Sequence, residues 1–120
     1  MKLITNILSI QSQIKVLHWQ TKSYPEHKAL GKLYEKLDSL FDTFVEVYIG
    51  KNGTIMAKEE FQFQVQNYSE KYCREYLDLI ISYFQETVTK ELKETDTDLF
   101  NIRDEIIESV NQTKYLLTLK

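Results

Sequence analysis

The stretch that decides the fold is residues 17–50, LHWQTKSYPEHKALGKLYEKLDSLFDTFVEVYIG. It holds both histidines of the chain, the end of one amphipathic segment, a short polar turn and a complete second amphipathic segment. The turn contains Ser23-Tyr24-Pro25-Glu26, whose serine, early proline and third-position glutamate predict a capping box and a new helix from about residue 24. Two helices joined by so short a turn form an antiparallel hairpin.

The apolar residues on both sides of this turn recur at helical spacing. They predict a first helix over about 2–20 and a second over about 24–49, which Gly50-Lys51-Asn52-Gly53 then ends. The first stripe is Leu3, Ile7, Ile10, Ile14 and Leu17, and the second is Leu30, Leu33, Tyr34, Leu37, Phe41, Phe44 and Tyr48.

The same periodicity predicts a third helix over about 68–92 and a fourth over about 97–118. Between the second and third helices, Phe61, Phe63 and Val65 alternate as in a strand, but one isolated strand is implausible. We therefore expect a crossover that contains at most a short helix. This crossover is long enough to run from one end of the bundle to the other. The prediction is one all-α domain over 1–120, an antiparallel four-helix bundle with the single long crossover of ferritin-like folds.

Composition narrows the class of protein. The chain has 120 residues and a net charge of −3, which gives no electrostatic basis for binding nucleic acid or an anionic membrane. The single cysteine, Cys73, excludes an internal disulfide, and no apolar run approaches the ~18 residues of a membrane span. Polar residues near the start and the lack of a small-residue cleavage motif argue against a signal peptide. We expect a soluble cytoplasmic protein.

Four residues have the chemistry of a metal site: His18, His27, Asp42 and Glu46. Histidine and carboxylate together are common ligands of iron, zinc and manganese. His18 and His27 flank the turn and should lie together, and Asp42 and Glu46 share a helix face. Asp42, however, lies fifteen residues beyond His27, or about 22 Å along a helix. Ligands must come within about 2 Å of a metal, so one subunit cannot supply all four to one centre.

A two-fold axis would bring the two halves together. If the second helix packs antiparallel against its own copy, the histidines of one subunit face the carboxylates of the other. With His27 at zero on a helical wheel, an acidic stripe of Asp38, Asp42, Glu35 and Glu46 follows at about 20°, 60°, 80° and 100°. Gly31 lies within this stripe at about 40°, a poor helix residue that a closely crossing helix would explain.

Plainer interpretations stay open. An acidic helix face is usually solvated, and two histidines beside a turn can be a cap and a half-buried packing residue. His18 and Trp19 can also form an aromatic cluster. The chain has no histidine after His27, which excludes the paired Glu-xx-His motifs of classical ferritins and di-iron enzymes. We expect Cys73 to be a buried structural thiol.

Other chemistry is less favoured. Tyr24, Tyr34 and Tyr48 are weaker candidates as electron donors near an iron centre. No Ser-His-Asp order, P-loop or glycine-rich nucleotide loop is present. We expect the acids on the third and fourth helices, Glu75, Asp78, Glu105 and Glu108, to be solvated or to cap helices.

These motifs resemble those of the Dps (mini-ferritin) family within the ferritin-like proteins. The resemblance covers residues 17–50: Leu17-His18-Trp19, then Tyr24 and His27, then Asp42-xxx-Glu46 with Ile49-Gly50 close behind. Several features differ from typical members. The step from His18 to His27 is shorter, the glycine after the His-Trp pair is missing, and the whole chain is shorter.

The resemblance implies a ferroxidase centre formed by His18 and His27 of one subunit with Asp42 and Glu46 of its two-fold mate. Trp19 would take the place of the family's tryptophan near that centre. In the family, iron(II) is oxidised at this centre by peroxide or oxygen, and the mineral is stored inside a shell. The function that this implies is iron storage or protection against oxidative damage. The implied partner is the chain itself, as a homodimer and, in the family's full assembly, a twelve-subunit shell. The basic tail with which some members bind DNA is absent, so no nucleic-acid partner is expected.

Small members of this kind also occur in phage genomes, which would make the protein phage-encoded and allow association with the virion. The rival class is a non-enzymatic ferritin-like protein with a degenerate metal site, serving phage assembly or host interaction.

Overall fold

The computed structural model describes residues 2–119, and every regular element within them is helical. Met1 and Lys120, the ends of the predicted domain, lie outside the described residues. The elements are α1 (Leu3–Gln20), α2 (Tyr24–Asn52), α3 (Glu70–Ser82), the π-helical segment η1 (Tyr83–Val88), α4 (Thr89–Glu91) and α5 (Thr97–Leu116). Because α3, η1 and α4 follow one another without a break, these elements form four rods.

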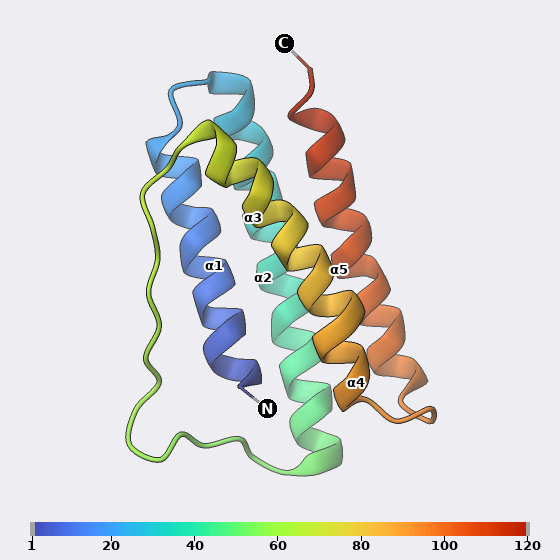
Figure 1. Cartoon of the computed structure of the whole chain (residues 1–120). Coiled ribbons are helices and arrows are strands. Elements are labelled where there is room, and N and C mark those ends of the chain that lie inside the picture. Colours follow the sequence, from blue (N-terminus) through green and yellow to red (C-terminus); the bar gives the residue numbers. More distant parts are fainter. Residues whose placement is uncertain (1, 120) are drawn as a thin grey trace.

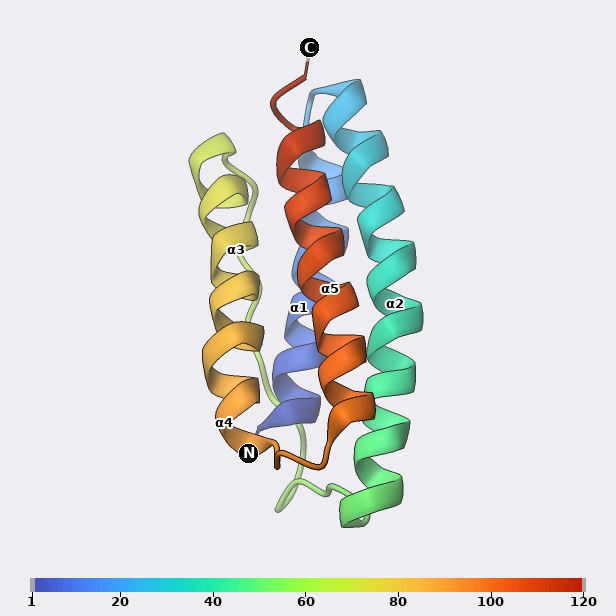
Figure 2. The ribbon, with the colours of Figure 1, turned by 90° about the vertical axis from the view of Figure 1, so that its right-hand side faces the viewer.

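The four rods lie side by side as a bundle, with α1 against α2, α2 against α5, and α5 against α3 (Figures 1 and 2). Helices α1 and α5 run in one direction, and α2 and α3 run in the other (Figure 1). Since α2 and α3 are parallel, the link between them has to travel the whole length of the bundle, and it does so along the outer side of α1 (Figure 1). The predicted end-to-end crossover is therefore present.

The apolar stripes form the core as predicted. All five stripe residues of α1 are buried, and so are the leucines and phenylalanines of the α2 stripe, whereas Tyr34 and Tyr48 are half-buried. Each fully buried Leu, Ile or Phe side chain contributes about 1.5–3 kcal/mol relative to an exposed one. These stripes are what holds the hairpin of α1 and α2 in place.

The predicted ends of α2 need two corrections. The Ser23 hydroxyl accepts a hydrogen bond from the Glu26 backbone N–H, as expected, but the Ser23 N–H donates to Thr21 instead of to Glu26. The capping box is thus only half formed. At the other end, the helix passes through Gly50 and stops at Gly53, whose φ of 90° is open to glycine without strain.

The third rod begins at Glu70, where the Ser69 hydroxyl caps the helix by accepting from the Tyr72 N–H. It is not the uniform helix predicted over 68–92. Ile80, Phe84 and Val88 are all fully buried, yet steps of four drift by about 40° each around an α-helix. The wider turns of η1 absorb this drift and keep the three side chains on one face.

The crossover is extended, without the short helix that the sequence allowed. It is attached to α1 by side-chain amides. Gln13 donates to the Gln66 carbonyl and accepts from the Gln66 N–H, at 2.9 and 2.7 Å. Gln20 donates to the Asn67 side-chain oxygen and accepts from the Tyr68 backbone N–H. Phe61, Phe63 and Val65 lie in this segment and are exposed.

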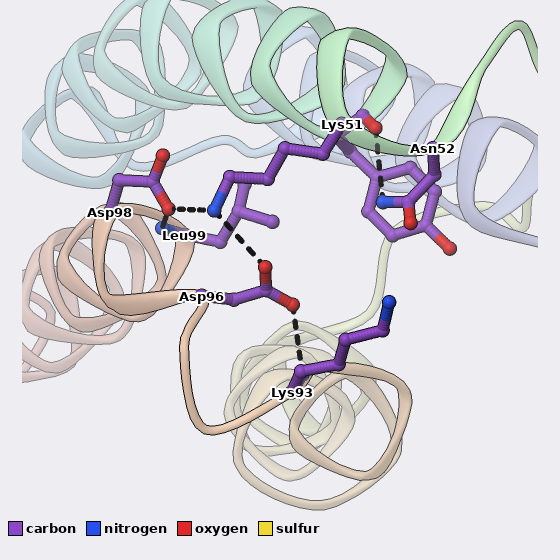
Figure 3. A network of polar contacts seen from close by, with 7 residues as sticks. Lys51, Asn52, Lys93, Asp96, Asp98 and Leu99 are labelled. Atoms are coloured by element: carbon purple, nitrogen blue, oxygen red, sulfur yellow. Dashed lines mark hydrogen bonds and ion pairs between the residues drawn. The ribbon is translucent and has the colours of Figure 1, made fainter.

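The end of α2 is tied to the start of α5 by ions. The Lys51 ammonium donates to the carboxylates of Asp96 and Asp98, and Asp96 also accepts from the Lys93 N–H (Figure 3).

Among residues 2–119, no helix has the length and hydropathy needed to cross a membrane.

Candidate metal site

The two histidines form a pair at the turn between α1 and α2. Their rings stack with centroids 3.9 Å apart and planes inclined by 14°. The His18 Nδ1 lies 2.7 Å from the His27 carbonyl oxygen, and the His27 Nδ1 lies 2.8 Å from the His18 carbonyl oxygen. The pair is therefore a reciprocal arrangement in which each ring is fixed by the backbone of the other residue.

These bonds determine where the ring protons are. A carbonyl oxygen only accepts, so both Nδ1 atoms must carry the donated proton. In the neutral rings, both Nε2 atoms then keep a lone pair. Metal-binding histidines usually donate their second ring N–H to a carbonyl or carboxylate in this way, which orients the ring and raises its basicity. The Nδ1 atoms are thus engaged by the two carbonyls, and the Nε2 atoms are the ones that could bind a metal ion.

Gly31 explains how the pair fits against α2. A Cβ atom built at this position would lie only 2.7 Å from the His18 Cε1 atom, closer than real side chains approach. The residue is glycine because the His18 ring packs on the helix backbone there. Within the chain, the close neighbour of Gly31 is thus a side chain from α1, and the crossing of a second copy's helix at Gly31 stays a prediction.

The histidine pair borders an open pocket of about 540 Å³. His18, His27, Gly31 and Glu35 line one part of it, and Leu116 and Leu119 at the end of α5 line another. A ligand or a partner side chain can therefore approach the pair from outside the bundle.

Asp42 and Glu46 lie one turn apart on the exposed surface of α2. Because α2 is one continuous helix from Tyr24 to Asn52, Asp42 is about 22 Å from His27 along the axis. Asp42 lines a separate hollow of about 240 Å³ with Ile4, Leu8 and Asp38. Within the described part of the chain, no three His, Cys, Asp or Glu side chains are grouped to bind one metal ion. The structure brings the two histidines together and leaves the two acids apart from them.

The other candidates lie in ordinary surroundings. Trp19 is 66% exposed, and its ring faces the Lys15 ammonium at 5.7 Å. The Tyr24 ring lies beside the histidine pair, with its centroid 6.3 Å from that of His27. Cys73 is fully buried, as predicted, and burial raises the pKa of its thiol to about 11.

The acids of the third and fourth rods are exposed, as expected. Of the four acids predicted to be solvated, Glu75 pairs with Lys71 at 3.7 Å and Asp78 pairs with Lys114 at 2.6 Å.

The sequence did not predict one polar cluster, which is formed around Glu26. Glu26 is buried, and its Oε2 atom accepts from Arg74 of α3 at 3.0 Å. Burial raises the pKa of Tyr68, at the end of the crossover, and the nearby Glu26 carboxylate raises it further. The sequence assigned Glu26 to a helix cap, and no local pattern indicates a partner 48 residues away.

Comparison with known proteins gives a family and one relative that matches over a short segment. A protein-family model described as a family of unknown function (DUF5856) matches residues 18–117. An uncharacterized 14.6 kDa protein from the mobD–ri intergenic region of Enterobacteria phage T4 is 36% identical over 47 residues. That match covers 39% of this chain and 37% of the phage protein. No solved structure matches the chain.

Proposed function

The chain belongs to this family of unknown function, DUF5856, and we propose that it is a Dps-like protein that oxidises iron(II). The site is shared between two subunits related by a two-fold axis. His18 and His27 come from one subunit, and Asp42 and Glu46 come from the other. The observation that carries the proposal is the stacked histidine pair, whose Nδ1 atoms are occupied by carbonyls and whose Nε2 atoms are left as ligands.

The stack favours two ions over one. Each Nε2 lone pair lies in the plane of its ring, and two stacked planes inclined by only 14° do not bring the lone pairs together at one point beside the rings. The ring separation of 3.9 Å is close to the ~3.5–4 Å between the ions of two-metal sites. Each imidazole would therefore bind its own ion, and the partner's carboxylates would supply the remaining ligands.

Imidazole and carboxylate donors suit iron(II), which is the substrate here, and they also accept zinc or manganese. Two iron(II) ions give two electrons to one hydrogen peroxide, which yields two iron(III) ions and two hydroxide ions. The carboxylates stabilise the more highly charged product more than the reactant, and so favour the oxidation. With oxygen as oxidant, four iron(II) ions and four protons are consumed for each oxygen molecule that is reduced to two waters.

The arrangement of the bundle supports the same proposal. Its parallel α2 and α3 are joined by one long crossover, which is the connection that a ferritin-like fold would need. The exposed Asp42 and Glu46 lie on α2, the helix that would pack antiparallel against its copy in the dimer. A larger shell that stores the oxidised iron would extend this dimer.

Iron oxidation tests the chemistry. Iron(II) is added under air or with peroxide, and absorbance near 300 nm is followed. We expect His18→Ala and Glu46→Ala to lower the initial rate at least tenfold. Glu108→Ala, which removes an exposed acid from α5, is the matched control and should keep the wild-type rate. Equal background rates in all four proteins would refute the proposal.

Mixing the two defective variants tests the shared site. In a mixed dimer, the histidines of the Glu46→Ala subunit face the intact acids of the His18→Ala subunit. One of the two sites is then complete, so random mixing should restore about a quarter of the wild-type rate. If sedimentation shows a monomer at micromolar concentration, or if mixing restores nothing in a proven dimer, the site is not shared.

A second candidate is a non-enzymatic interaction protein with the same bundle, for example in phage assembly or host interaction. The observation that favours it is the apolar part of the crossover, where Met56 is 82% exposed and Phe61, Phe63 and Val65 are also exposed. Substituting Phe61, Phe63 and Val65 together by Ser should leave iron oxidation unchanged if oxidation is the function. If the wild-type protein shows no ferroxidase activity, the interaction protein is the candidate that remains.

A further inference from the structure

The crossover contains an extended stretch whose backbone is unpaired. Residues 60–66, EFQFQVQ, run along the outer side of α1 and belong to no helix (Figure 1). Within residues 2–119, the N–H and C=O groups of residues 61–65 make no hydrogen bond to another backbone group. An extended segment with unpaired backbone groups is a template on which another strand can pair.

The attachment to α1 shows which edge of this stretch faces outward. In an extended chain, consecutive residues direct their N–H and C=O groups to opposite edges. Both backbone groups of Gln66 bond to the Gln13 side chain of α1. The edge of the even-numbered residues therefore faces α1. The odd-numbered residues, Phe61, Phe63 and Val65, direct their N–H and C=O groups away from the bundle.

The stretch is open to the approach of a second chain. Phe61, Phe63 and Val65 are 39%, 41% and 39% exposed, so their side chains keep apolar surface in contact with solvent. Phe61, Gln62, Phe63 and Gln64 line an open hollow of about 660 Å³, and no other residue of the described chain lines it. Another strand can therefore reach the outward edge without the displacement of a helix.

The residue pattern favours a second copy of the same stretch as the partner, because the pattern is symmetric about Phe63. An antiparallel copy with its two-fold axis at Phe63 would place Phe61 opposite the partner's Val65. Aromatic and β-branched side chains are favourable cross-strand neighbours. The charges agree, because each Glu60 would lie opposite a neutral Gln66. Parallel pairing in register would instead place each Glu60 opposite its own copy, and like charges directly opposite are destabilising.

We propose that residues 61–65 form an interface at which two copies of the chain pair as antiparallel strands. Phe63 exchanges both backbone hydrogen bonds with its copy, and Phe61 exchanges both with the partner's Val65. The proposal is independent of iron oxidation, because none of the four proposed iron ligands lies in the crossover. A chain that also pairs through α2 would carry two different two-fold interfaces, which together link dimers into a larger assembly.

Disulfide cross-linking tests the register of the pairing. Gln62 would lie opposite the partner's Gln64 in a pair without backbone bonds, where the Cα atoms are about 4.5 Å apart. A disulfide spans this distance, but it does not span the about 7–8 Å between either residue and its own copy. The native Cys73 is fully buried and does not interfere.

The variants Gln62→Cys and Gln64→Cys are prepared separately, mixed at submillimolar concentration and oxidised with diamide. We expect the mixture to give at least tenfold more covalent dimer than either variant alone. A mixture that gives no more covalent dimer than the single variants would overturn the proposal. The measurement does not use iron, so this result would leave the ferroxidase proposal standing.

Two substitutions at Phe63 test whether the backbone carries the pairing. Phe63→Pro removes the outward N–H group, whereas Phe63→Thr removes the ring but keeps that group. Both positions are exposed and outside the helices, so circular dichroism should show the same helix content in both proteins. Added to both cysteine variants, Phe63→Pro should give at least fivefold less covalent dimer than Phe63→Thr. Equal yields would show that the two copies do not pair as strands.

Discussion

At the level of single residues, Gly31 shows how an exception to helix propensity reports a contact. Glycine in the interior of a helix costs about 1 kcal/mol relative to alanine. At Gly31 the cost is offset because the His18 ring occupies the space of a Cβ atom. At Gly50, in the same helix, a Cβ atom would meet nothing within 4 Å. The two glycines form a natural pair for an experiment.

We predict opposite effects of alanine at these two positions. Gly50→Ala should stabilise the protein by about 0.5–1 kcal/mol through helix propensity alone. Gly31→Ala should displace the His18 ring, so this gain is cancelled or reversed. Urea unfolding measures both free energies. Long-range ¹H–¹⁵N spectra of the imidazoles should show Nδ1-protonated rings in the wild type and in Gly50→Ala, with the His18 signal altered in Gly31→Ala. An unchanged His18 tautomer in Gly31→Ala would contradict the reciprocal pairing.

At the level of the element, the crossover shows how an extended segment is kept in place without a sheet. Its Phe-Gln alternation has the period of a strand, but its fixed backbone partner is the Gln13 side chain, whose amide imitates a neighbouring peptide. Gln13 is 1% exposed, so water cannot replace these bonds easily. A polar residue on the apolar face of α1 thus determines where the crossover is attached.

We predict that Gln13→Ala loosens the crossover before it affects the helices. The Gln66 N–H loses its acceptor, so its hydrogen exchange should speed up, and the free energy of unfolding should fall by about 1–3 kcal/mol. Gln11→Ala is the control, because Gln11 makes an exposed bond to Asp38 and should change stability by less than about 0.5 kcal/mol. Equal effects of the two substitutions would mean that Gln13 does not anchor the segment.

At the level of the whole molecule, the two ends of the bundle are held differently. The end with the histidines has the Glu26–Arg74 pair beside a pocket. The opposite end is joined by Lys51, which pairs with the buried Asp96 and the exposed Asp98 (Figure 3). The Lys93 N–H and then Lys51 lower the pKa of Asp96, and Lys51 lowers the pKa of Asp98. The same bonds raise the pKa of Lys51 above its ordinary value of 10.5.

The signs of these shifts give a pH window. A carboxylate whose pKa is lower in the folded state stabilises the fold above its unfolded value of 3.8, and this contribution is lost as the pH falls through the folded pKa. The Lys51 contribution is present below 10.5 and is lost as the pH rises through its raised pKa. The network is therefore complete between about pH 4 and pH 10.

We predict that Lys51→Met lowers the urea midpoint slightly at pH 7 and has a smaller effect at pH 3, where the aspartates are becoming protonated. Lys36→Met, which removes an exposed lysine from the same helix, should behave like the wild type at both values. A Lys51→Met effect that is as large at pH 3 as at pH 7 would show that the lysine acts through packing and not through charge.

The sequence by itself determined the four rods, their buried faces and the distance between the histidines and the acids. These properties depend on local periodicity and on a fixed rise per residue, which neighbouring residues set. It did not reveal the stacking of His18 on His27, the reason for Gly31, the Gln13 anchor or the Glu26–Arg74 pair. Only the tertiary structure decided these, because each is a contact between segments whose approach depends on how the whole bundle packs.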